Sequence, residues 1–331
     1  MLPNPAIRRR TLRALAGIIV ITPLLNAGPA LAADAYPSKP IRLIVGYPPG
    51  GSNDIAARII APELSQLLGV SVVVENKAGA NGVIGADHVA KAAPDGYTLL
   101  LSSMSPVILA PQTMKRPPFN ATEDFAAINM MALTPEAIAM GSKRHDIKTL
   151  PELLELAKTE RITLSSSGSG GLPHLTIELL KKVRPNIEHV PYKGAGPALT
   201  DTLAGHVDGI VMDLPPLYSQ IKEGKLNALA VTSEQRVNFL SQVPTAHEAL
   251  PGFNVENWVG IFAPANTPAP ILARLDQAVR KAVTQPKVTT ALEAVALSPA
   301  TRDSSAAFQQ QVADDYTRWG KVLRDSGVEM N

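Results

Sequence analysis

The sequence predicts an α/β protein built from two similar units, and three observations carry that prediction. Short apolar runs rich in β-formers alternate with amphipathic helical segments. Glycine-rich turns follow the predicted strands in both halves of the chain. Two extended stretches, residues 128–141 and 253–265, bracket a middle α/β unit. Unbroken apolar strands between helices indicate a parallel sheet covered by helices on both faces.

The first 32 residues have the composition of an export signal. Basic residues between positions 8 and 13 precede an apolar stretch, which ends in the small-residue pattern Ala30-Leu31-Ala32. The alternative is a membrane anchor, but Pro23 to Pro29 interrupt the apolar run well short of the roughly 20 residues that span a bilayer. We therefore predict a cleaved signal peptide over residues 1–32, with cleavage after Ala32 or close by, and export to the periplasm.

The composition of the remaining chain excludes several classes of function. Removal of residues 1–32 takes away four arginines and no acid, so the formal charge moves from +2 to −2. A nearly neutral protein with 4% aromatic residues is a poor candidate for nucleic-acid binding. The absence of cysteine excludes disulfides, thiolate metal sites and cysteine nucleophiles. The remaining length is enough for two lobes, each with its own core.

The first predicted unit starts directly after the signal. Apolar residues predict strands over 41–47, 71–76 and 97–103. Helical spacing predicts a helix over 55–68 after the first strand and another over 83–93 after the second.

The second predicted unit has the same organisation. Thr149 and Pro151 open a helix over 149–159. The following elements are a strand over 161–167, a helix over 172–183, a strand over 187–192, a helix over 197–205, and strands over 208–214 and 226–233. After the second extended stretch the chain is mostly helical. We therefore predict a discontinuous lobe 1 over 33–140 and 254–331, and a lobe 2 over 141–253.

Glycine-rich turns mark the candidate binding site. In open α/β sheets, ligands bind beyond the carboxyl ends of strands, where such turns leave backbone amides free. The turns are "GYPPGGSND" (46–54), "SSSGSGGLPHL" (165–175) and "VPYKGAGPAL" (190–199), and "NKAGANGVIGAD" (76–87) is a fourth. None ends in the G-K-[ST] of a nucleotide phosphate site. The alternative for each turn is that its glycines only reverse the chain.

The residues in these turns favour a small anion held by dipoles. Lys193 is the only basic residue in the three turns that follow strands, and the serines at 52, 103, 166, 167 and 169 supply hydroxyls. This combination predicts recognition by oriented N–H groups and hydroxyls instead of an arginine clamp.

No catalytic constellation is present. The sequence contains no G-x-S-x-G, and "HEALP" at His247 lacks the second histidine of a zinc-protease motif. His174 is the only histidine near the predicted cleft, and a structural hydrogen bond is the favoured interpretation over catalysis. Asp213, at a strand end, either orients a ligand amine or water, or caps the helix that starts near Pro215. We therefore expect that the protein is not an enzyme and that it binds neither a metal nor a cofactor.

Five ordered blocks resemble one known family. They are "YPSKPIRLIVGYPPGGSNDIAARIIAPELSQLLG", "VVVENKAGANGVIGADHVAKAAPDGYTLLL", "HVPYKGAGPALTDTLAGHVD", "IKEGKLNALAVTS" and "VPTAHEALPGF". They resemble the Bug (Bordetella uptake gene) proteins, the periplasmic substrate-binding subunits of tripartite tricarboxylate transporters. The resemblance implies the type II periplasmic binding protein fold, in which two α/β lobes joined by two hinge crossings enclose a ligand, often a small carboxylate.

The resemblance also implies a set of ligand-binding residues. The first loop maps to Tyr47, Gly50, Gly51, Ser52, Asn53 and Asp54, the second to Ser166, Ser167, Gly168, Gly170 and His174, and the third to Tyr192, Lys193 and Gly194. Ser103 and Asp213 join this set because they end strands at the predicted cleft. Two positions depart from the family pattern. Gly171 stands where members often have Ser or Thr, and Met212 stands where many carry an acid.

The predicted function is capture of a small carboxylate in the periplasm and its delivery to the membrane subunits of a tripartite tricarboxylate transporter. The ligand is an organic acid, with an amino acid or an aromatic acid also open. An alternative is a binding protein that presents its ligand to a sensor kinase. A periplasmic hydrolase or isomerase is disfavoured because its residue constellations are missing. We expect a monomer that binds no nucleic acid.

Overall fold

The computed structural model describes residues 36–326. The predicted signal peptide over residues 1–32 lies outside the described residues. In the described part of the chain, no helix combines the length and apolar character that crossing a membrane requires.

Lobe 1 starts with three parallel strands. β1 (Ile41–Val45) lies between β2 (Val72–Asn76) and β3 (Thr98–Ser103). The helical elements are α1 (Ser52–Leu68), the short 3-10 turn η1 (Ala80–Gly82), α2 (Val83–Ala90), the π-helical turn η2 (Ser105–Leu109) and α3 (Ala110–Gln112). The predicted order of strands and helices is confirmed here.

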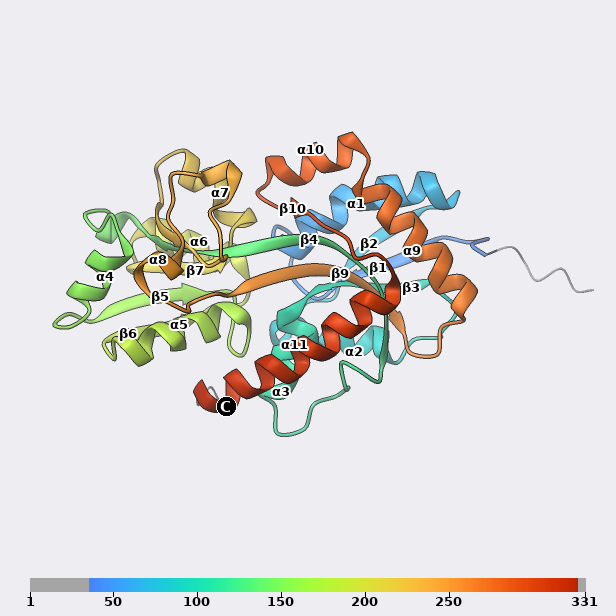
Figure 1. Ribbon diagram of the computed structural model, residues 1–331, viewed down its shortest axis with the longest axis horizontal. Coiled ribbons are helices and arrows are strands. Elements are labelled where there is room, and N and C mark those ends of the chain that lie inside the picture. Colours follow the sequence, from blue (N-terminus) through green and yellow to red (C-terminus); the bar gives the residue numbers. More distant parts are fainter. Residues whose placement is uncertain (1–35, 327–331) are drawn as a thin grey trace, which may run out of the picture. The chain divides into compact units, whose positions relative to one another are not determined.

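The two predicted extended stretches are long neighbouring strands. β4 (Phe125–Met140) and β9 (Glu256–Pro264) pair in an antiparallel register that places Thr134 opposite Asn257. They run side by side through the molecule (Figure 1). One strand leaves lobe 1 and the other returns to it, so they run in opposite directions. The sheet is therefore mixed, and the prediction of a parallel sheet is wrong for these two strands and for β3, which pairs antiparallel with β9 inside lobe 1.

Lobe 2 repeats the arrangement. β5 (Ile162–Ser166) lies between β6 (Ile187–Pro191) and β7 (Gly209–Asp213), parallel to both. β7 and β8 (Asn227–Val231) pair antiparallel with the far end of β4. The helical elements are η3 (Ser142–Arg144), α4 (Leu150–Leu156), α5 (Leu172–Val183), α6 (Ala195–Ala204), α7 (Pro215–Lys222), η4 (Asn238–Leu240) and α8 (Ala246–Ala249).

The C-terminal segment returns to lobe 1. It comprises α9 (Ala269–Val283), α10 (Pro286–Ala294), the two-residue strand β10 (Ser298–Pro299) and α11 (Ser305–Ser326). Helices α9 and α11 both pack on β4, and β10 pairs with it.

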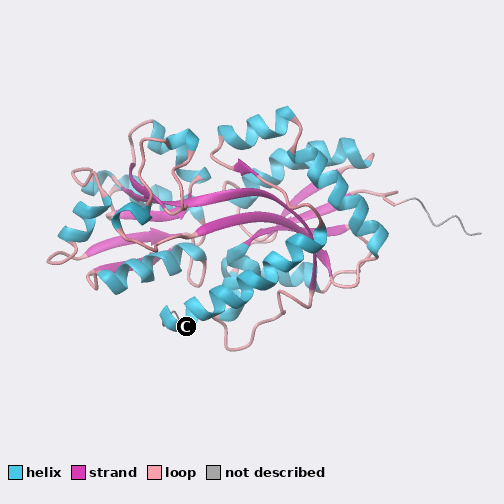
Figure 2. Ribbon diagram, in the orientation of Figure 1, coloured by secondary structure: helices cyan, strands magenta, loops and turns pink. Residues whose placement is uncertain are grey.

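Both lobes have helices on the two faces of the sheet (Figure 2). Side chains alternate along β1, so Leu43 packs with α1, whereas Ile44 packs with α2 on the opposite face. In lobe 2, Ile138 and Ala139 of β4 likewise face two separate cores. The carboxyl ends of β1, β3 and β7 lie at the predicted site. Tyr47 follows the end of β1, and Ser103 and Asp213 end the other two strands.

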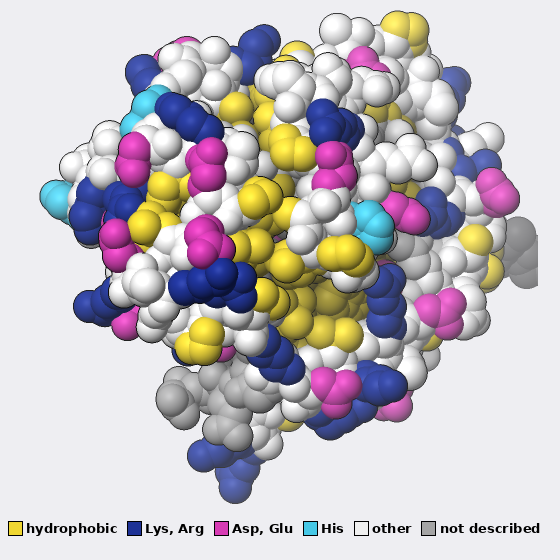
Figure 3. All heavy atoms as spheres, turned by 60° about the vertical axis from the view of Figure 1, so that its left-hand side comes forward, with side chains coloured by type: hydrophobic (Ala, Val, Ile, Leu, Met, Phe, Trp, Pro, Cys, Tyr) yellow, Lys and Arg dark blue, Asp and Glu magenta, His cyan; other side chains and the backbone are white. Residues whose placement is uncertain are grey.

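Charged side chains of both signs are interspersed on the surface. Figure 3 shows this on one face, where Lys and Arg alternate with Asp and Glu around a hydrophobic hollow. No large field of a single sign covers that face, as the nearly neutral composition predicts.

Candidate functional site

A pocket lies where the two lobes meet, and we call it the inner pocket. Its cavity volume is about 30 Å³, so the two sides of the pocket lie close together. Its lining residues are Tyr47, Pro48, Gly51, Ser52, Asn53, Ser103, Ser105, Ser167, Pro173, Ala195, Met212, Asp213 and Pro216. Ser103 and Asp213 are the last residues of β3 and β7, so the pocket lies at the carboxyl ends of the strands.

Four helices begin at the inner pocket. Gly51 to Asn53 start α1, while Pro173, Ala195 and Pro216 lie in the first turns of α5, α6 and α7. Only α1 and α6 have open first amides, because the Leu172 N–H of α5 donates to Ser105 Oγ and α7 begins with two prolines, which have no N–H. The first amides of a helix lack intrahelical acceptors, and the helix dipole adds partial positive charge there. The pocket therefore offers a concentration of positive potential made by backbone groups, which suits an anion.

The only charged side chain among the described lining residues is that of Asp213. Its Oδ1 accepts a hydrogen bond from Asn257 Nδ2 at 3.0 Å, and Ser52 lines the same pocket. Burial raises the pKa of Asp213 to about 6, while the side chains of Asn257 and Ser52 lower it. The alternative in which Asp213 caps the next helix is wrong, since the N-cap of α7 is Leu214 and no side chain caps it.

Tyr47 and Asn81 connect the first and fourth glycine-rich turns. The Tyr47 hydroxyl donates to Asn81 Oδ1 at 2.8 Å. Burial and the charge of Asp213 raise the pKa of Tyr47, which keeps its phenol neutral. Asn81 reaches the lobe 2 loop, because a Cβ placed on Gly171 would lie 2.3 Å from Asn81 Nδ2. Glycine at position 171, where the family pattern often has Ser or Thr, has a physical reason in this chain, since the side chain of Ser or Thr would collide with Asn81.

A second pocket, the outer pocket, adjoins the first. The two share Tyr47, Pro48 and Ser167, and the outer pocket has a cavity volume of about 590 Å³. Its other lining residues are Ala78, Gly79, Ala80, Asn81, Gly82, Gly168, Ser169, Pro191, Tyr192, Lys193 and Gly194. The structure thus places Tyr192, Lys193 and Gly194 of the predicted third loop in the outer pocket, while Ala195 of the same loop lines the inner pocket.

The predicted site residues divide into three groups. Those in the inner pocket are Tyr47, Gly51, Ser52, Asn53, Ser103, Ser167 and Asp213. Those in the outer pocket only are Gly168, Tyr192, Lys193 and Gly194. Gly50, Asp54, Ser166, Gly170 and His174 line neither pocket.

The third group supports the loops. Asp54 Oδ2 accepts from the Gly50 N–H at 3.0 Å, and its carboxylate also binds Arg58 and Asn76, all of which fix the first loop. The Gly170 N–H donates to His174 Nδ1 at 2.9 Å. This is the structural hydrogen bond that the sequence favoured for His174.

Sequence reasoning missed several lining residues. Ser105 lies two residues past the predicted strand, and its Oγ accepts from the Leu172 N–H of lobe 2 at 2.9 Å. Asn257 lies in the second extended stretch, where no local motif marks it, and it contacts Asp213 only because β9 pairs with β4. Asn81 carried a local signal, because it lies in the fourth glycine-rich turn, but no single residue in that turn was singled out.

The sequence of this chain matches the model of one protein family over most of its length. The model described as "Tripartite tricarboxylate transporter family receptor" matches residues 56–328. The chain belongs to the tripartite tricarboxylate transporter receptor family. Members of this family are solute-binding receptors and not enzymes, which confirms the expectation drawn from the missing catalytic motifs.

Individual receptors of known name or structure are similar over nearly the whole chain. Protein BugT of Bordetella pertussis is 36% identical over 326 residues, covering 96% of this chain and 98% of BugT. MatC from Rhodopseudomonas palustris, solved with bound malate, is 30% identical with a TM-score of 0.81, covering 87% of this chain and 100% of MatC. A second R. palustris protein, solved with adipate, is 29% identical with a TM-score of 0.84, covering 89% and 99%. The receptor has the two-lobe periplasmic binding protein fold.

Proposed function

We propose that this receptor captures a small carboxylate in the periplasm and delivers it to the membrane subunits of a tripartite tricarboxylate transporter. One observation carries the proposal. The uncapped N-termini of α1 and α6 converge on a pocket that no described lysine or arginine lines. Such a site stabilises an anion by fixed dipoles and hydroxyls. The similarity to two structures that hold malate and adipate supports a carboxylate as that anion.

Within the inner pocket, the start of α1 is the best position for the carboxylate. Ser52 and Asn53 are buried, so water reaches their amides poorly, and no capping side chain satisfies them. Ser103, Ser105 and Ser167 add hydroxyls from β3, η2 and the second loop. We assign the recognition of the carboxylate to these groups. Lys193 in the outer pocket can contribute only to the far end of a longer ligand.

We also propose that ligand binding is coupled to a hinge. The predicted lobes, 33–140 with 254–331 and 141–253, are connected through β4 and β9. Pocket residues come from both lobes, as Ser52 and Asp213 illustrate. A ligand that contacts both sides favours the conformation in which they approach each other. Small-angle scattering should show compaction when a confirmed ligand is added. An unchanged profile would argue against the hinge.

A thermal-shift screen tests the binding proposal. The protein purified from the periplasm is heated with mono-, di- and tricarboxylates and, as controls, with the corresponding amides. A ligand that binds only the folded state must raise the unfolding temperature. We expect at least one carboxylate to do so while its amide does not. If amides and acids act alike, or if no acid acts, the site does not recognise carboxylates.

Delivery to the transporter needs a second experiment. A strain without this receptor should lose uptake of the ligand found in the screen, and the wild-type chain should restore it. A variant that folds but does not bind should not restore uptake. Normal uptake in the deletion strain would show that this receptor is not needed for transport of that ligand.

A further inference from the structure

We propose that a groove between α5 and α11, which we call the back groove, is the docking surface for an acidic, amphipathic segment of a membrane subunit of the transporter. The inference rests on the proposed function and goes beyond it, because it names a second surface and the chemistry of the segment that binds there. The back groove has a cavity volume of about 520 Å³. It shares no lining residue with the inner or the outer pocket.

The walls of the back groove are apolar and come from both lobes. Leu179 and Val183 of α5 and Phe253 line it from lobe 2, while Trp319 and Val322 of α11 line it from lobe 1. Val183 is 39% exposed, which is unusual for a large apolar side chain. Figure 3 shows a hydrophobic hollow at the surface, bordered in part by Lys and Arg. An apolar groove between two helices fits the apolar face of an amphipathic partner helix.

The charges at the back groove are positive and lack carboxylate partners. Lys182 and Arg318 are the only charged side chains among its described lining residues. Lys182 Nζ donates to a backbone carbonyl of α11, and the Arg318 guanidinium lies 5.1 Å from the centre of the Trp319 ring. Asp315, the acid near Arg318 on α11, instead accepts from Trp258 Nε1 at 2.9 Å. The complementary partner therefore carries Asp or Glu beside its apolar residues, and Arg and Trp are the residue types that most often dominate binding energy at interfaces.

Helix α5 connects the back groove to the inner pocket. At its N-terminal end, Pro173 lines the inner pocket and the Leu172 N–H donates to Ser105 Oγ of lobe 1 at 2.9 Å. At its C-terminal end, Lys182 Nζ donates to the carbonyl of Asp325 in α11. The helix has 12 residues and is therefore about 18 Å long. A packed helix moves as a rigid element, so a rotation of lobe 2 that changes the inner pocket also moves one wall of the back groove.

The back groove is open in the conformation in which the inner pocket is narrow. The two cavity volumes, about 520 Å³ and about 30 Å³, belong to the same structure. A ligand that contacts both sides of the inner pocket favours this conformation. A partner that fills the back groove favours it as well, so each raises the affinity of the receptor for the other. Docking at this groove thus distinguishes a loaded receptor from an empty one.

Charge reversal at the back groove tests the proposal. The membrane subunits, purified in nanodiscs, are titrated with the receptor in the presence and absence of the carboxylate found in the screen. We expect that carboxylate to raise the affinity of the receptor for the subunits by about fivefold or more. Lys182→Glu combined with Arg318→Glu should lower this affinity by at least about tenfold.

The double variant should fold, because both side chains are exposed. Thermal unfolding checks its stability, and calorimetry should find its affinity for the carboxylate within about twofold of wild type. The matched control is Lys115→Glu combined with Arg116→Glu. These two cations are also exposed, and they line neither the back groove nor the two ligand pockets. The control should dock as wild type does.

A second variant tests the apolar wall. Val183→Asp removes an apolar contact and places a carboxylate where an acidic partner should lie, so the affinity for the membrane subunits should fall by at least about tenfold. Val73→Asp is its matched control, since Val73 is 47% exposed on β2 and lines none of the three cavities. It should leave docking unchanged.

Three outcomes overturn the inference. One is wild-type affinity for the membrane subunits in both groove variants of a receptor whose deletion abolishes uptake; the transport proposal then stands and the docking surface is wrong. Another is self-association of the wild type that both groove variants abolish in analytical ultracentrifugation, because the occupant is then a second copy. The third is equally tight binding of the wild type to protein-free phosphatidylglycerol vesicles, because the groove then recognises an anionic lipid surface. Absence of any docking, combined with normal uptake in the deletion strain, refutes the transport proposal itself.

Discussion

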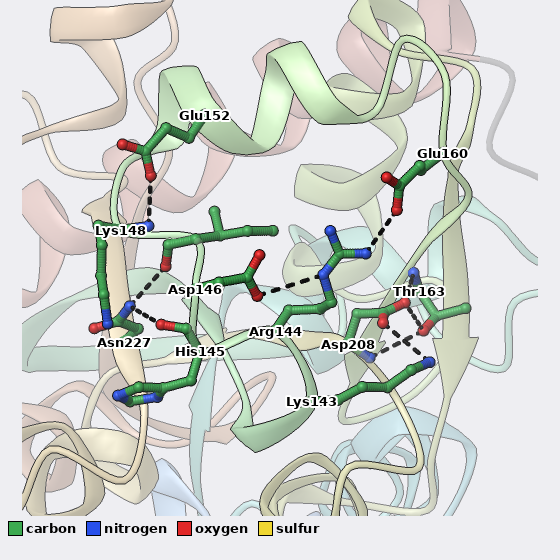
Figure 4. A network of polar contacts seen from close by, with 11 residues as sticks. Lys143, Arg144, His145, Asp146, Lys148, Glu152, Glu160, Thr163, Asp208 and Asn227 are labelled. Atoms are coloured by element: carbon green, nitrogen blue, oxygen red, sulfur yellow. Dashed lines mark hydrogen bonds and ion pairs between the residues drawn. The ribbon is translucent and has the colours of Figure 1, made fainter.

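The N-termini of α1 and α4 are built in opposite ways. At α4, Thr149 Oγ1 accepts from the Glu152 N–H at 3.3 Å. The Glu152 carboxylate accepts in return from the Thr149 N–H at 3.2 Å. It also accepts from the Lys148 N–H at 2.7 Å (Figure 4). At α1 the N-cap is Gly51, which has no side chain to accept a bond. The protein satisfies the amides of one helix and leaves those of the other open.

The comparison shows that the chain lacks, at the pocket, the stability that a side-chain cap provides. A side-chain cap stabilises a helix by about 1 kcal/mol, and α8 repeats the capping box of α4 with Thr245 and Glu248. Uncapped helices occur elsewhere, but α9 begins at exposed residues where water satisfies the amides. At α1 the first three residues are buried. Open amides combined with burial, and not open amides alone, mark the binding site.

The largest expected effect on affinity comes from placing an acidic residue at the N-cap of α1. Gly51→Asp places a carboxylate where the ligand carboxylate should bind, and repulsion should reduce affinity by more than about 100-fold. Gly51 has an extended φ of −80°, and an added Cβ would come no closer than 3.8 Å to its neighbours. The variant should therefore fold, with stability changed by only a few tenths of a kcal/mol. Calorimetry with the ligand found in the screen gives the affinity.

Gly51→Asn is the control for that variant. It adds a side chain of the same size without charge, so affinity should fall much less than in Gly51→Asp. Equal losses of affinity in both variants would show that the size of the added side chain, and not its charge, prevents binding.

Lys193→Met should weaken binding by less than about tenfold, because the fixed dipoles persist. Complete loss of binding in Lys193→Met would replace amide-based recognition with a lysine-centred site.

A second expected effect concerns pH, since the pKa values of Asp213 at the pocket and of Glu248 at the α8 cap are shifted in opposite directions. The Arg236 side chain and the Thr245 N–H hold the pKa of Glu248 at about 2, whereas burial raises the pKa of Asp213 to about 6. Burial and the charge of Asp213 also raise the pKa of Glu136. A raised carboxyl pKa means that the native state binds more protons than the unfolded state, so stability falls as the pH rises.

The unliganded protein should thus lose stability between about pH 4 and pH 6 as Asp213 ionises, and more above that range as Glu136 does. At one pKa unit per 1.4 kcal/mol, Asp213 contributes a loss of roughly 2–3 kcal/mol. Urea unfolding at several pH values measures it. Asp213→Asn should flatten the lower part of the profile. Parallel profiles for the wild type and Asp213→Asn over this range would show that the pKa of Asp213 is not raised in the folded state.

The sequence predicted the elements better than it predicted their pairing. Apolar runs and helix signals located strands β1 to β9 and most helices before residue 253, and α5 occupies the predicted residues 172–183. The C-terminal helices α9, α10 and α11 were predicted only as one mostly helical segment. Those signals are local. The antiparallel pairing of β4 with β9 is not, because it depends on where the chain leaves and re-enters a lobe. For the same reason the first loop was found from its glycines, while Asn257, which is distant in sequence from Asp213, was missed.

The smallest expected effect tests the other half of the comparison. Thr149→Ala removes the acceptor of the Glu152 N–H at α4, and the lost cap should lower the free energy of unfolding by about 1 kcal/mol. Affinity should stay within about twofold, since Thr149 and Glu152 line neither pocket. Serine at the same position keeps the hydroxyl, so Thr149→Ser should retain most of the stability. Denaturant unfolding and calorimetry on the two variants give both quantities. An affinity loss in Thr149→Ala that Thr149→Ser restores would show that the α4 cap is coupled to the pocket, and the division between helices that serve the fold and helices that serve the ligand would then fail.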